Sequence, residues 1–296
     1  MHKDATRGRT EVSAPEPAGH SAQPLQPSTP LLVVIDPAAR AADGEAVRIA
    51  RDVLCAGAEG GPAKVCLPDG PEEFARALTR RGSRRPVVVG DDGALLRAVT
   101  VLHRERELAS AVLSLVPVGA ATGLAHALGV PTGTVAAARA VLDGAPRRLD
   151  LLVDDSDGVV IGRLAIPAGA SMEPDGTAAP GSLLGTCRSL VRTLVRPAPQ
   201  APSAPGTARL RVEADGVTLA DLDQPVEAVS VRTLRGGLAR VEVRAAAAGS
   251  LVRAQARTVT VSGPDFRYRA DTTTAGPVRA RTWTVRPGAW ALTLPS

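Results

Sequence analysis

In the first half of the chain, short apolar runs alternate with stretches whose apolar residues recur every three or four positions. The apolar runs have the length of strands and predict strands at 31–36, 63–68, 86–90 and 111–117. The amphipathic stretches between and after them predict helices at 46–54, 72–81, 94–103, 123–129 and 134–144. Because the strands are apolar throughout rather than alternating, both faces of their sheet should be covered, as in parallel α/β folds.

From residue 208 onward, apolar and polar residues alternate strictly, which indicates antiparallel strands. The alternating runs are 208–214, 227–234, 238–245, 256–263, 266–271, 280–286 and 290–295. Gly236–Gly237 and the SerGlyProAsp stretch at 262–265 are typical of hairpin turns between such runs. Before this region we expect strands within 149–155 and 158–166, a Pro/Gly-rich stretch at 167–181 and one helix at 183–195.

These patterns predict an α/β fold: an N-terminal parallel-sheet, Rossmann-like domain followed by a mostly antiparallel β-sandwich domain. We place a disordered tail at 1–29, the α/β domain at 30–146 and the β-rich domain at 147–296, with a Pro/Ala linker at 196–206. The tail has no apolar core of the kind that signal peptides carry. The segment 108–130 lacks formal charge and resembles a membrane span, but its proline and glycines favour a strand followed by a helix.

Composition removes several classes of function. Aromatic residues make up 2% of the 296, so bases of single-stranded nucleic acid have little to stack on, and we expect no nucleic-acid partner. Cys55, Cys66 and Cys187 show no CxxC spacing, and the four histidines are dispersed, so a structural zinc site is unsupported. We interpret the cysteines as reduced, partly buried thiols, which predicts a cytoplasmic protein.

The net charge of +5 leaves two interpretations open. The densest basic cluster consists of Arg80, Arg81, Arg84 and Arg85, which could either bind an anionic partner or form a solvated helix end and loop. The sequence supports neither a dinucleotide-binding fold nor a P-loop, because neither GxGxxG at a strand-to-helix turn nor GxxxxGK[ST] occurs in the chain.

Several turns nevertheless carry spaced motifs. They read DPAAR at 36–40, GDDGA at 90–94, PVGAATGLAHALGVP at 117–131 and RADTTTAGP at 269–277, and the chain closes on VRPGAWALTLP. In order and spacing this set resembles the diacylglycerol kinase catalytic family, which includes bacterial lipid kinases and sphingosine kinases, and whose motifs are NPxSG, GGDGT, PLGTGNDFA and DGE. RRLDLLV at 147–153 is also similar to the family's entry into its second domain.

The resemblance implies a phosphofructokinase-like N-terminal domain, ATP and Mg²⁺ in the cleft between the domains, and phosphoryl transfer to a lipid hydroxyl such as that of diacylglycerol. Contact with the membrane, if any, would be peripheral at its inner face. Gly90, Asp92 and Gly93 match the GGDGT turn, with Asp92 as the implied metal ligand. Gly119 matches the third turn and Asp271, the implied catalytic residue, matches the aspartate of DGE.

The same residues also have a plain structural interpretation. The glycines would serve turn geometry, Asp92 would cap the helix that follows it, and Asp271 would be a turn residue. If the family resemblance is accidental, the turn at 90–93 and the strand end near Asp271 have no reason to meet. If it is real, these two segments should lie together at one cleft.

The motifs depart from the family at positions that matter for chemistry. Asp91 replaces a glycine of the phosphate turn, and a charge about 4 Å from a phosphate would repel it by about 4 kcal/mol at an effective dielectric near 20. Thr273 stands where the family has the glutamate of DGE. The other departures are Asp36, Arg40, Ala94, Ala120, Ala121, Thr122 and Gly123. The chain is therefore either a divergent lipid kinase or an inactive lipid-kinase fold that acts as a lipid-binding or regulatory module.

Overall fold

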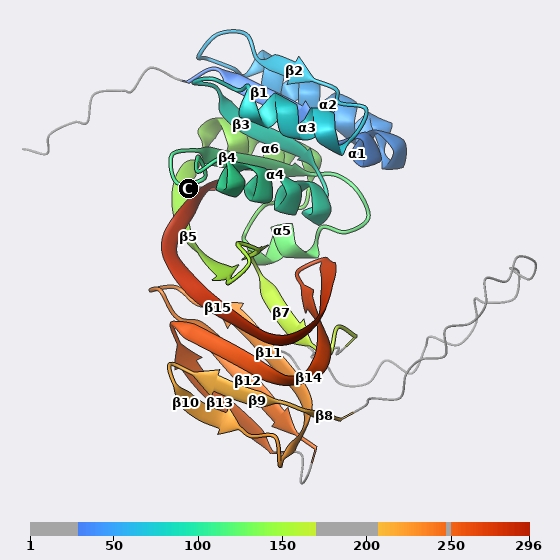
Figure 1. Ribbon diagram of the computed structural model, residues 1–296. Helices are drawn as coiled ribbons and strands as arrows, with labels where there is room; N and C mark the ends of the chain where they lie inside the picture. The colour runs from blue at the N-terminus through green and yellow to red at the C-terminus, as the bar shows by residue number, and fades with distance from the viewer. Residues whose placement is uncertain (1–28, 170–206, 247–249) are drawn as a thin grey trace, which may run out of the picture.

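The computed structural model describes residues 29–169, 207–246 and 250–296 (Figure 1). The expected N-terminal tail, the helix at 183–195, the Pro/Ala linker and Cys187 lie outside these ranges. Of the two cysteines that are described, Cys55 is exposed rather than partly buried, and Cys66 is half-buried.

The N-terminal part is a parallel sheet in the order β4-β3-β1-β2, formed by β1 (Leu31–Ile35), β2 (Lys64–Cys66), β3 (Arg85–Gly90) and β4 (Val112–Pro117). Its helices are α1 (Pro37–Ala42), α2 (Gly44–Ala56), α3 (Pro71–Thr79), α4 (Asp92–Arg104), α5 (Gly123–Ala127) and α6 (Thr134–Asp143). All predicted helices and strands that lie in this part of the chain are present. The short helix α1 was not predicted, because its six residues follow the first strand directly and carry no amphipathic repeat.

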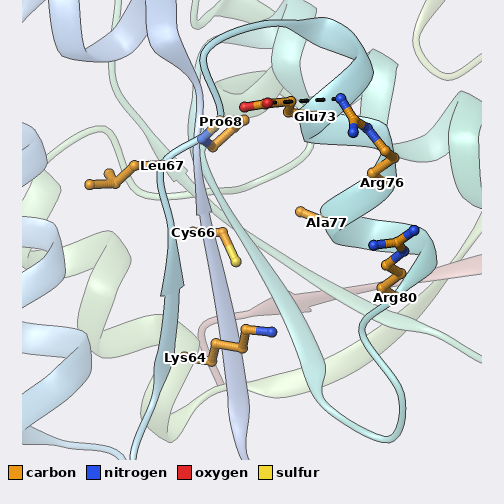
Figure 2. Close-up of a pocket in the computed structure, with 8 residues that line it drawn as sticks. All are labelled: Lys64, Cys66, Leu67, Pro68, Glu73, Arg76, Ala77 and Arg80. Carbon is orange, nitrogen blue, oxygen red and sulfur yellow. Dashed lines mark ion pairs between the residues drawn. The ribbon is translucent and has the colours of Figure 1, made fainter.

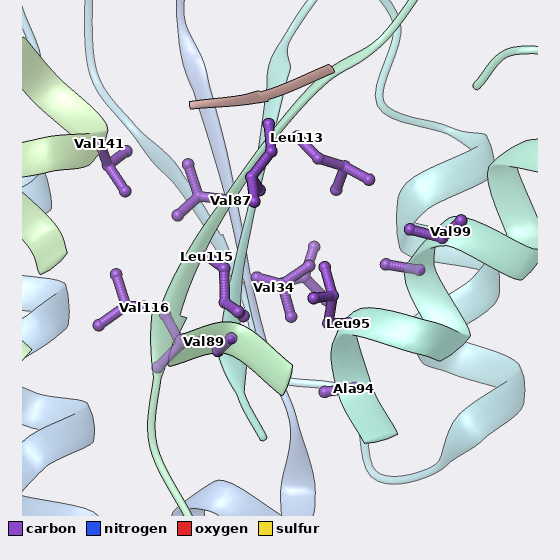
Figure 3. Packing of buried hydrophobic residues seen from close by; sticks show 14 of the residues in the cluster. Val34, Val87, Val89, Ala94, Leu95, Val99, Leu113, Leu115, Val116 and Val141 are labelled. Atoms are coloured by element: carbon purple, nitrogen blue, oxygen red, sulfur yellow. The ribbon is translucent and has the colours of Figure 1, made fainter. Parts of the chain in front are cut away.

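Helices cover both faces of this sheet, as the uninterrupted apolar strands predicted. α2 packs on α6 and α3 packs on α4. Figure 3 shows Val141 of α6 on one side of the strands and Leu95 and Val99 of α4 on the other. All five residues of β1 are buried, because both of its faces meet helices.

The C-terminal part is largely antiparallel and surrounds a second core. Its strands are β5 (Ala145–Asp154), β6 (Val159–Val160), β7 (Arg163–Ile166), β8 (Ala208–Arg209), β9 (Arg211–Ala214), β10 (Val217–Ala220), β11 (Pro225–Thr233), β12 (Ala239–Ala245), β13 (Leu251–Ala256), β14 (Thr258–Ala270) and β15 (Thr273–Leu294). The start of β14 pairs with β9 and its end pairs with β7, so this long strand links β9 to β7. The fold class predicted from the pattern is thus confirmed.

The turn predicted at 262–265 was wrong. Residues 258–270 form one strand, and the pairing of β14 with β15 shifts in register between Ser262 and Phe266. Pro264 cannot donate to a ladder, and a bulge accommodates it without ending the strand. The predicted turn at Gly236–Gly237 does separate β11 from β12.

Strand β15 connects the two parts of the molecule. It pairs with β14 at its start, with β5 along much of its length, and in parallel with β4 near its end. Trp283 is buried in the C-terminal core, whereas Trp290, Leu292 and Leu294 are buried in the N-terminal core. The last strand thus returns to complete the first core (Figure 1), and the division of the chain at residue 147 stays a prediction.

Candidate functional site

The turns that follow β3 and β4 are held against each other by main-chain hydrogen bonds. Val118 N donates to Gly90 O at 3.0 Å, and Asp92 N donates to Ala121 O at 2.8 Å. These turns leave the carboxyl ends of neighbouring parallel strands, which is where open α/β sheets bind ligands. The second and third motifs therefore form one structural unit.

Two of the predicted site glycines are required by close packing in this unit. A Cβ at Gly90 would lie 2.6 Å from Ala94 Cβ and 3.1 Å from Asp36 Cβ, so only glycine lets α4 start this close to β1. Gly119 has φ +130° and a Cβ there would lie 3.1 Å from Asp91 Cβ. Gly93 lies in the first turn of α4. Their structural roles are clear, whereas their roles toward a cofactor stay predictions.

Asp91 supplies its own negative charge to the start of α4. It is the N-cap of this 13-residue helix, and its Oδ1 accepts a hydrogen bond from Ala94 N at 3.0 Å. The N-terminus of a helix attracts anions, because its first N–H groups are unpaired and the helix dipole is positive there. The Asp91 carboxylate lies where a phosphate turn would present these N–H groups to a ligand.

Asp92 caps a different helix from the one expected. Its side chain is buried, and its two carboxylate oxygens accept hydrogen bonds from Leu124 N at 2.8 Å and Ala125 N at 2.9 Å. It thereby caps the N-terminus of α5, whose own N-cap, Thr122, makes no side-chain hydrogen bond. The structural interpretation that Asp92 caps α4 was wrong, since Asp91 does so.

Asp271 lies in the turn between β14 and β15, with φ +50°. Its carboxylate accepts three main-chain hydrogen bonds, from Ile161 N at 2.7 Å, Gly162 N at 2.8 Å and Arg163 N at 2.7 Å. Burial raises the pKa of the Asp271 carboxyl above its ordinary value, and these three N–H donors oppose the shift. The nearby charge of Asp92 adds to the increase in the pKa of Asp271.

Asp92 and Asp271 line the same cavity, of about 650 Å³. One wall comes from α5 through Gly123, Leu124 and Ala127, and the opposite wall comes from strands of the C-terminal part. The second and fourth motifs, which lie far apart in the sequence, thus meet at one cleft, as the resemblance required. If the match were accidental, the turn at 90–93 and the strand end near Asp271 would have no reason to meet. Their meeting therefore favours the family resemblance.

The sheet wall of the cavity carries side chains that the motif analysis missed. We call them the arginine face: Arg163 on β7, Arg232 on β11, Arg244 on β12, Arg253 on β13 and Arg269 on β14. The signal was present in the sequence, because arginine recurs at the polar positions of several alternating runs. It could not be interpreted without knowing which strands are neighbours.

A second hollow of about 330 Å³ lies beside β2 and α3 (Figure 2). Lys64, Arg76 and Arg80 contribute positive charge to it, and Glu73 pairs with Arg76 at 3.8 Å. Of the basic cluster found in the sequence, Arg81 pairs with Glu107, and Arg85 donates to Val141 O at 2.7 Å. These two arginines therefore have structural partners, as the interpretation without an anionic ligand expects.

Solved structures share this fold, with its α/β part and its strand-rich part. A Bacillus anthracis str. Sterne protein described provisionally as a diacylglycerol kinase matches with a TM-score of 0.67 at 13% identity, over 93% of this chain and 98% of its own. A second structure from that organism, described as a diacylglycerol kinase, matches with a TM-score of 0.65 at 12% identity, over 90% of this chain and 97% of its own. At such identities the likeness shows a common fold.

A family model matches the N-terminal part of the sequence. Residues 30–153 match the family model of the diacylglycerol kinase catalytic domain. This match confirms the resemblance drawn from the motifs. No curated protein matches the chain in a search by sequence.

A domain of this family suggests ATP-dependent phosphoryl transfer in general, but the residues of this cleft do not fit ATP with Mg²⁺. Asp91 already caps the helix end that would receive a phosphate. The carboxylates of Asp92 and Asp271, the candidate metal ligand and catalytic residue, already accept main-chain hydrogen bonds on both oxygens. Within 29–169, 207–246 and 250–296, no group of three or more His, Cys, Asp or Glu side chains could hold a metal ion.

In the described part of the chain, no helix is both long enough and apolar enough to cross a bilayer. The uncharged segment 108–130 contains β4 and α5, as its proline and glycines predicted.

Proposed function

We propose that this chain is a lipid-binding protein of the diacylglycerol kinase fold that does not transfer a phosphoryl group from ATP. The observation that carries the proposal is the state of its carboxylates. Asp92 and Asp271 are tied to five main-chain N–H groups, which hold α5 and the β6–β7 connection in place. A carboxylate that is held in this way acts as a structural cap. If it also bound a metal ion or accepted a proton as a general base, these interactions would compete with its hydrogen bonds to the main chain.

Two substitutions support the same conclusion. Asp91 places a carboxylate at the start of α4, so an incoming phosphate would meet repulsion as well as a helix end that is already capped. Thr273 is exposed at the start of β15 and has no carboxylate with which to accept a proton from a lipid hydroxyl. Loss of a general base typically costs about 10² to 10⁴ in rate.

The lipid part of the proposal is supported by the cavity and by the family. Leu124, Ala127 and Leu251 give the cavity an apolar stretch beside the arginine face, which suits an amphiphile with an anionic head. We place the protein in the cytoplasm, in peripheral contact with the inner face of the membrane from which it would take this lipid.

A divergent lipid kinase is the second candidate. It is favoured by the position of Asp92 and Asp271 at one cavity, and by the raised pKa of Asp271, since shifted pKa values are frequent at catalytic sites. Each Asp92 oxygen also retains a second lone pair, so Asp92 and Asp271 could share metal and base duties.

Transfer of labelled phosphate from ATP to diacylglycerol in mixed micelles separates the two candidates, and calorimetric titration with Mg·ATP measures nucleotide binding. We expect neither transfer nor nucleotide binding by the natural chain, together with retention of the protein on lipid vesicles. The matched variant carries Asp91→Gly and Thr273→Glu, which restore two family residues, and it should gain nucleotide affinity. Transfer by the natural chain that Asp92→Asn abolishes would reject our proposal and establish the kinase.

A further inference from the structure

The arginine face brings like charges directly opposite one another across neighbouring strands. Arg163 on β7 pairs in register with Arg232 on β11, and Arg232 also pairs in register with Arg240 on β12, which does not line the cavity. Side chains opposite each other in an antiparallel pair have Cβ atoms about 4.5–5.5 Å apart, and like charges at that distance destabilise a sheet. The other side of the same strands packs into the C-terminal core through Leu164, Val231 and Val241, so the register cannot slip to relieve the repulsion.

The next row of residues neutralises little of this charge. Glu242 on β12 pairs with Arg253 on β13 at 3.1 Å. Arg269 on β14 lies opposite Ala165 on β7, beside the Arg163 position. In the part of the chain that the structure describes, Arg232, Arg244 and Arg269 form no ion pair with a carboxylate. The pKa of Arg163 is lowered by burial and, next, by the positive charges of Arg269 and Arg232, which is the expected sign of mutual repulsion.

The remaining walls of the cavity restrict which anion could fit. Asp92 is held at the N-terminus of α5 and Asp271 lies in the β14–β15 turn, so both carboxylates repel a negative group and favour a position for it away from them. Among the residues that the structure describes, no aromatic side chain lines the cavity to stack on a nucleotide base, whereas Leu124, Ala127 and Leu251 offer apolar contact. Guanidinium groups bind phosphate oxygens in bidentate pairs, and several converging on one site suit a group with two negative charges.

We propose that Arg232, Arg244 and Arg269 form a binding site for the phosphomonoester headgroup of a lipid, with the lipid's apolar portion against Leu124, Ala127 and Leu251. This inference rests on the proposed function as a lipid-binding protein. It assigns the anion to the strand face of the cleft, and not to the glycine turns, where Asp91 already caps α4. The protein would accordingly retain a phosphorylated lipid and not the neutral lipid that a kinase consumes.

The test compares the natural chain with a triple variant, Arg232→Gln, Arg244→Gln and Arg269→Gln. A matched control neutralises three exposed arginines elsewhere, through Arg84→Gln, Arg139→Gln and Arg147→Gln, so both variants have the same net charge. Each protein is sedimented with phosphatidylcholine vesicles that contain either phosphatidate, a phosphomonoester, or phosphatidylserine, a phosphodiester, at equal surface charge. The thermal unfolding midpoint is measured with short-chain phosphatidate and, separately, with inorganic phosphate.

We expect the natural chain and the control to bind phosphatidate vesicles in preference to phosphatidylserine vesicles. The triple variant should bind phosphatidate at least tenfold more weakly, since each charge-assisted hydrogen bond is commonly worth about tenfold in affinity. Without ligand it should unfold at the same or a higher temperature, because repulsion is removed. A larger midpoint shift with short-chain phosphatidate than with inorganic phosphate would support the lipid, and equal shifts would assign the site to free phosphate and overturn the lipid assignment.

Three other outcomes would overturn the inference in distinguishable ways. Undiminished phosphatidate binding by the triple variant would reject the arginine site and leave lipid binding intact. Equal retention on phosphatidylserine vesicles would show a general charge contact and no headgroup site. Absence of lipid binding by the natural chain would reject the proposed function together with this site. By contrast, if the natural chain transfers phosphate from ATP and also binds phosphatidate through these arginines, the arginine site stands and only the proposed lack of turnover is rejected.

Discussion

Asp154 shows how a single buried carboxylate organises this molecule at the scale of a residue. Its Oδ1 accepts hydrogen bonds from Ser156 N at 2.8 Å, Ser156 Oγ at 2.7 Å and Gly158 N at 2.8 Å, which close the turn after β5. Its Oδ2 accepts a longer hydrogen bond from the Tyr268 hydroxyl at 3.3 Å. Tyr268 is the only tyrosine in the chain, and its ring meets Trp283 edge to face with centroids 5.2 Å apart.

The tyrosine therefore gives a prediction about pH. Burial, and secondly the charge of Asp154, raise the pKa of Tyr268 above its ordinary value of about 10. Because the folded-state pKa lies above the unfolded one, the stabilisation is present below pH about 10 and is lost as pH rises through the folded-state pKa. We expect the tyrosinate absorbance of the native chain to appear only above that pH, and the free energy of unfolding to fall over the same range.

Tyr268→Phe is the control for this titration. It removes the ionising hydroxyl and leaves Asp154 with its three shorter hydrogen bonds, so the fold should persist. The variant should show no tyrosinate signal and a smaller alkaline loss of stability. An absorbance midpoint at or below pH about 10 in the native chain would contradict the prediction.

Residue identity alone did not reveal which of two adjacent carboxylates caps which helix. Asp91 and Asp92 both precede an amphipathic run, and either could have been the N-cap of α4. The choice depends on backbone geometry: Asp91 is extended, with φ −89° and ψ −173°, whereas Asp92 is already helical and its side chain points to α5. Since α5 comes from a turn about thirty residues later, no local pattern could have predicted this contact.

At the scale of elements, β4 and β15 are joined by a buried hydroxyl pair. Ser114 Oγ donates to Thr293 Oγ1 at 2.8 Å, and both side chains are buried. The pair lies where the last strand returns to the N-terminal sheet, between residues 179 positions apart in the sequence. A buried hydroxyl that loses its partner costs about 1–3 kcal/mol, whereas removal of both partners is nearly neutral.

A double-mutant cycle tests this pair. Thr293→Val alone should lower the free energy of unfolding by about 1–3 kcal/mol, because it leaves the Ser114 hydroxyl without an acceptor in an apolar environment. The double variant with Ser114→Ala should cost less than the sum of the two single variants, as denaturant unfolding would measure. Additive single effects would mean that the hydroxyls do not interact in solution.

Sequence patterns predicted individual helices and strands better than they predicted contacts between them. The buried strands and the amphipathic helices of residues 31–144 were predicted because period and burial agree within each segment. The turn at 262–265 was wrong because glycine and proline are as common in bulges as in hairpins, and only the partner strand distinguishes them. The arginine face shows the same limit, because it exists only through the register of β7, β11 and β12.

At the scale of the whole molecule, the two cores share one strand. The N-terminal core buries Trp290 of β15 and the C-terminal core buries Trp283 of the same strand. These are the only tryptophans in the chain. An element that contributes to two cores couples their stability, since unfolding either core removes contacts from the strand that supports the other. The cleft with Asp92 and Asp271 lies between these cores and depends on that coupling.

The pair of tryptophans makes the coupling measurable. In Trp283→Phe the remaining fluorescence reports the N-terminal core, and in Trp290→Phe it reports the C-terminal core. Within each variant, we expect urea transitions followed by fluorescence and by far-ultraviolet circular dichroism to coincide, because β15 makes unfolding a single cooperative event. The comparison is made inside one protein, so the destabilisation caused by each core substitution does not affect it. If fluorescence and dichroism have separate midpoints in both variants, the cores unfold independently and β15 does not couple them.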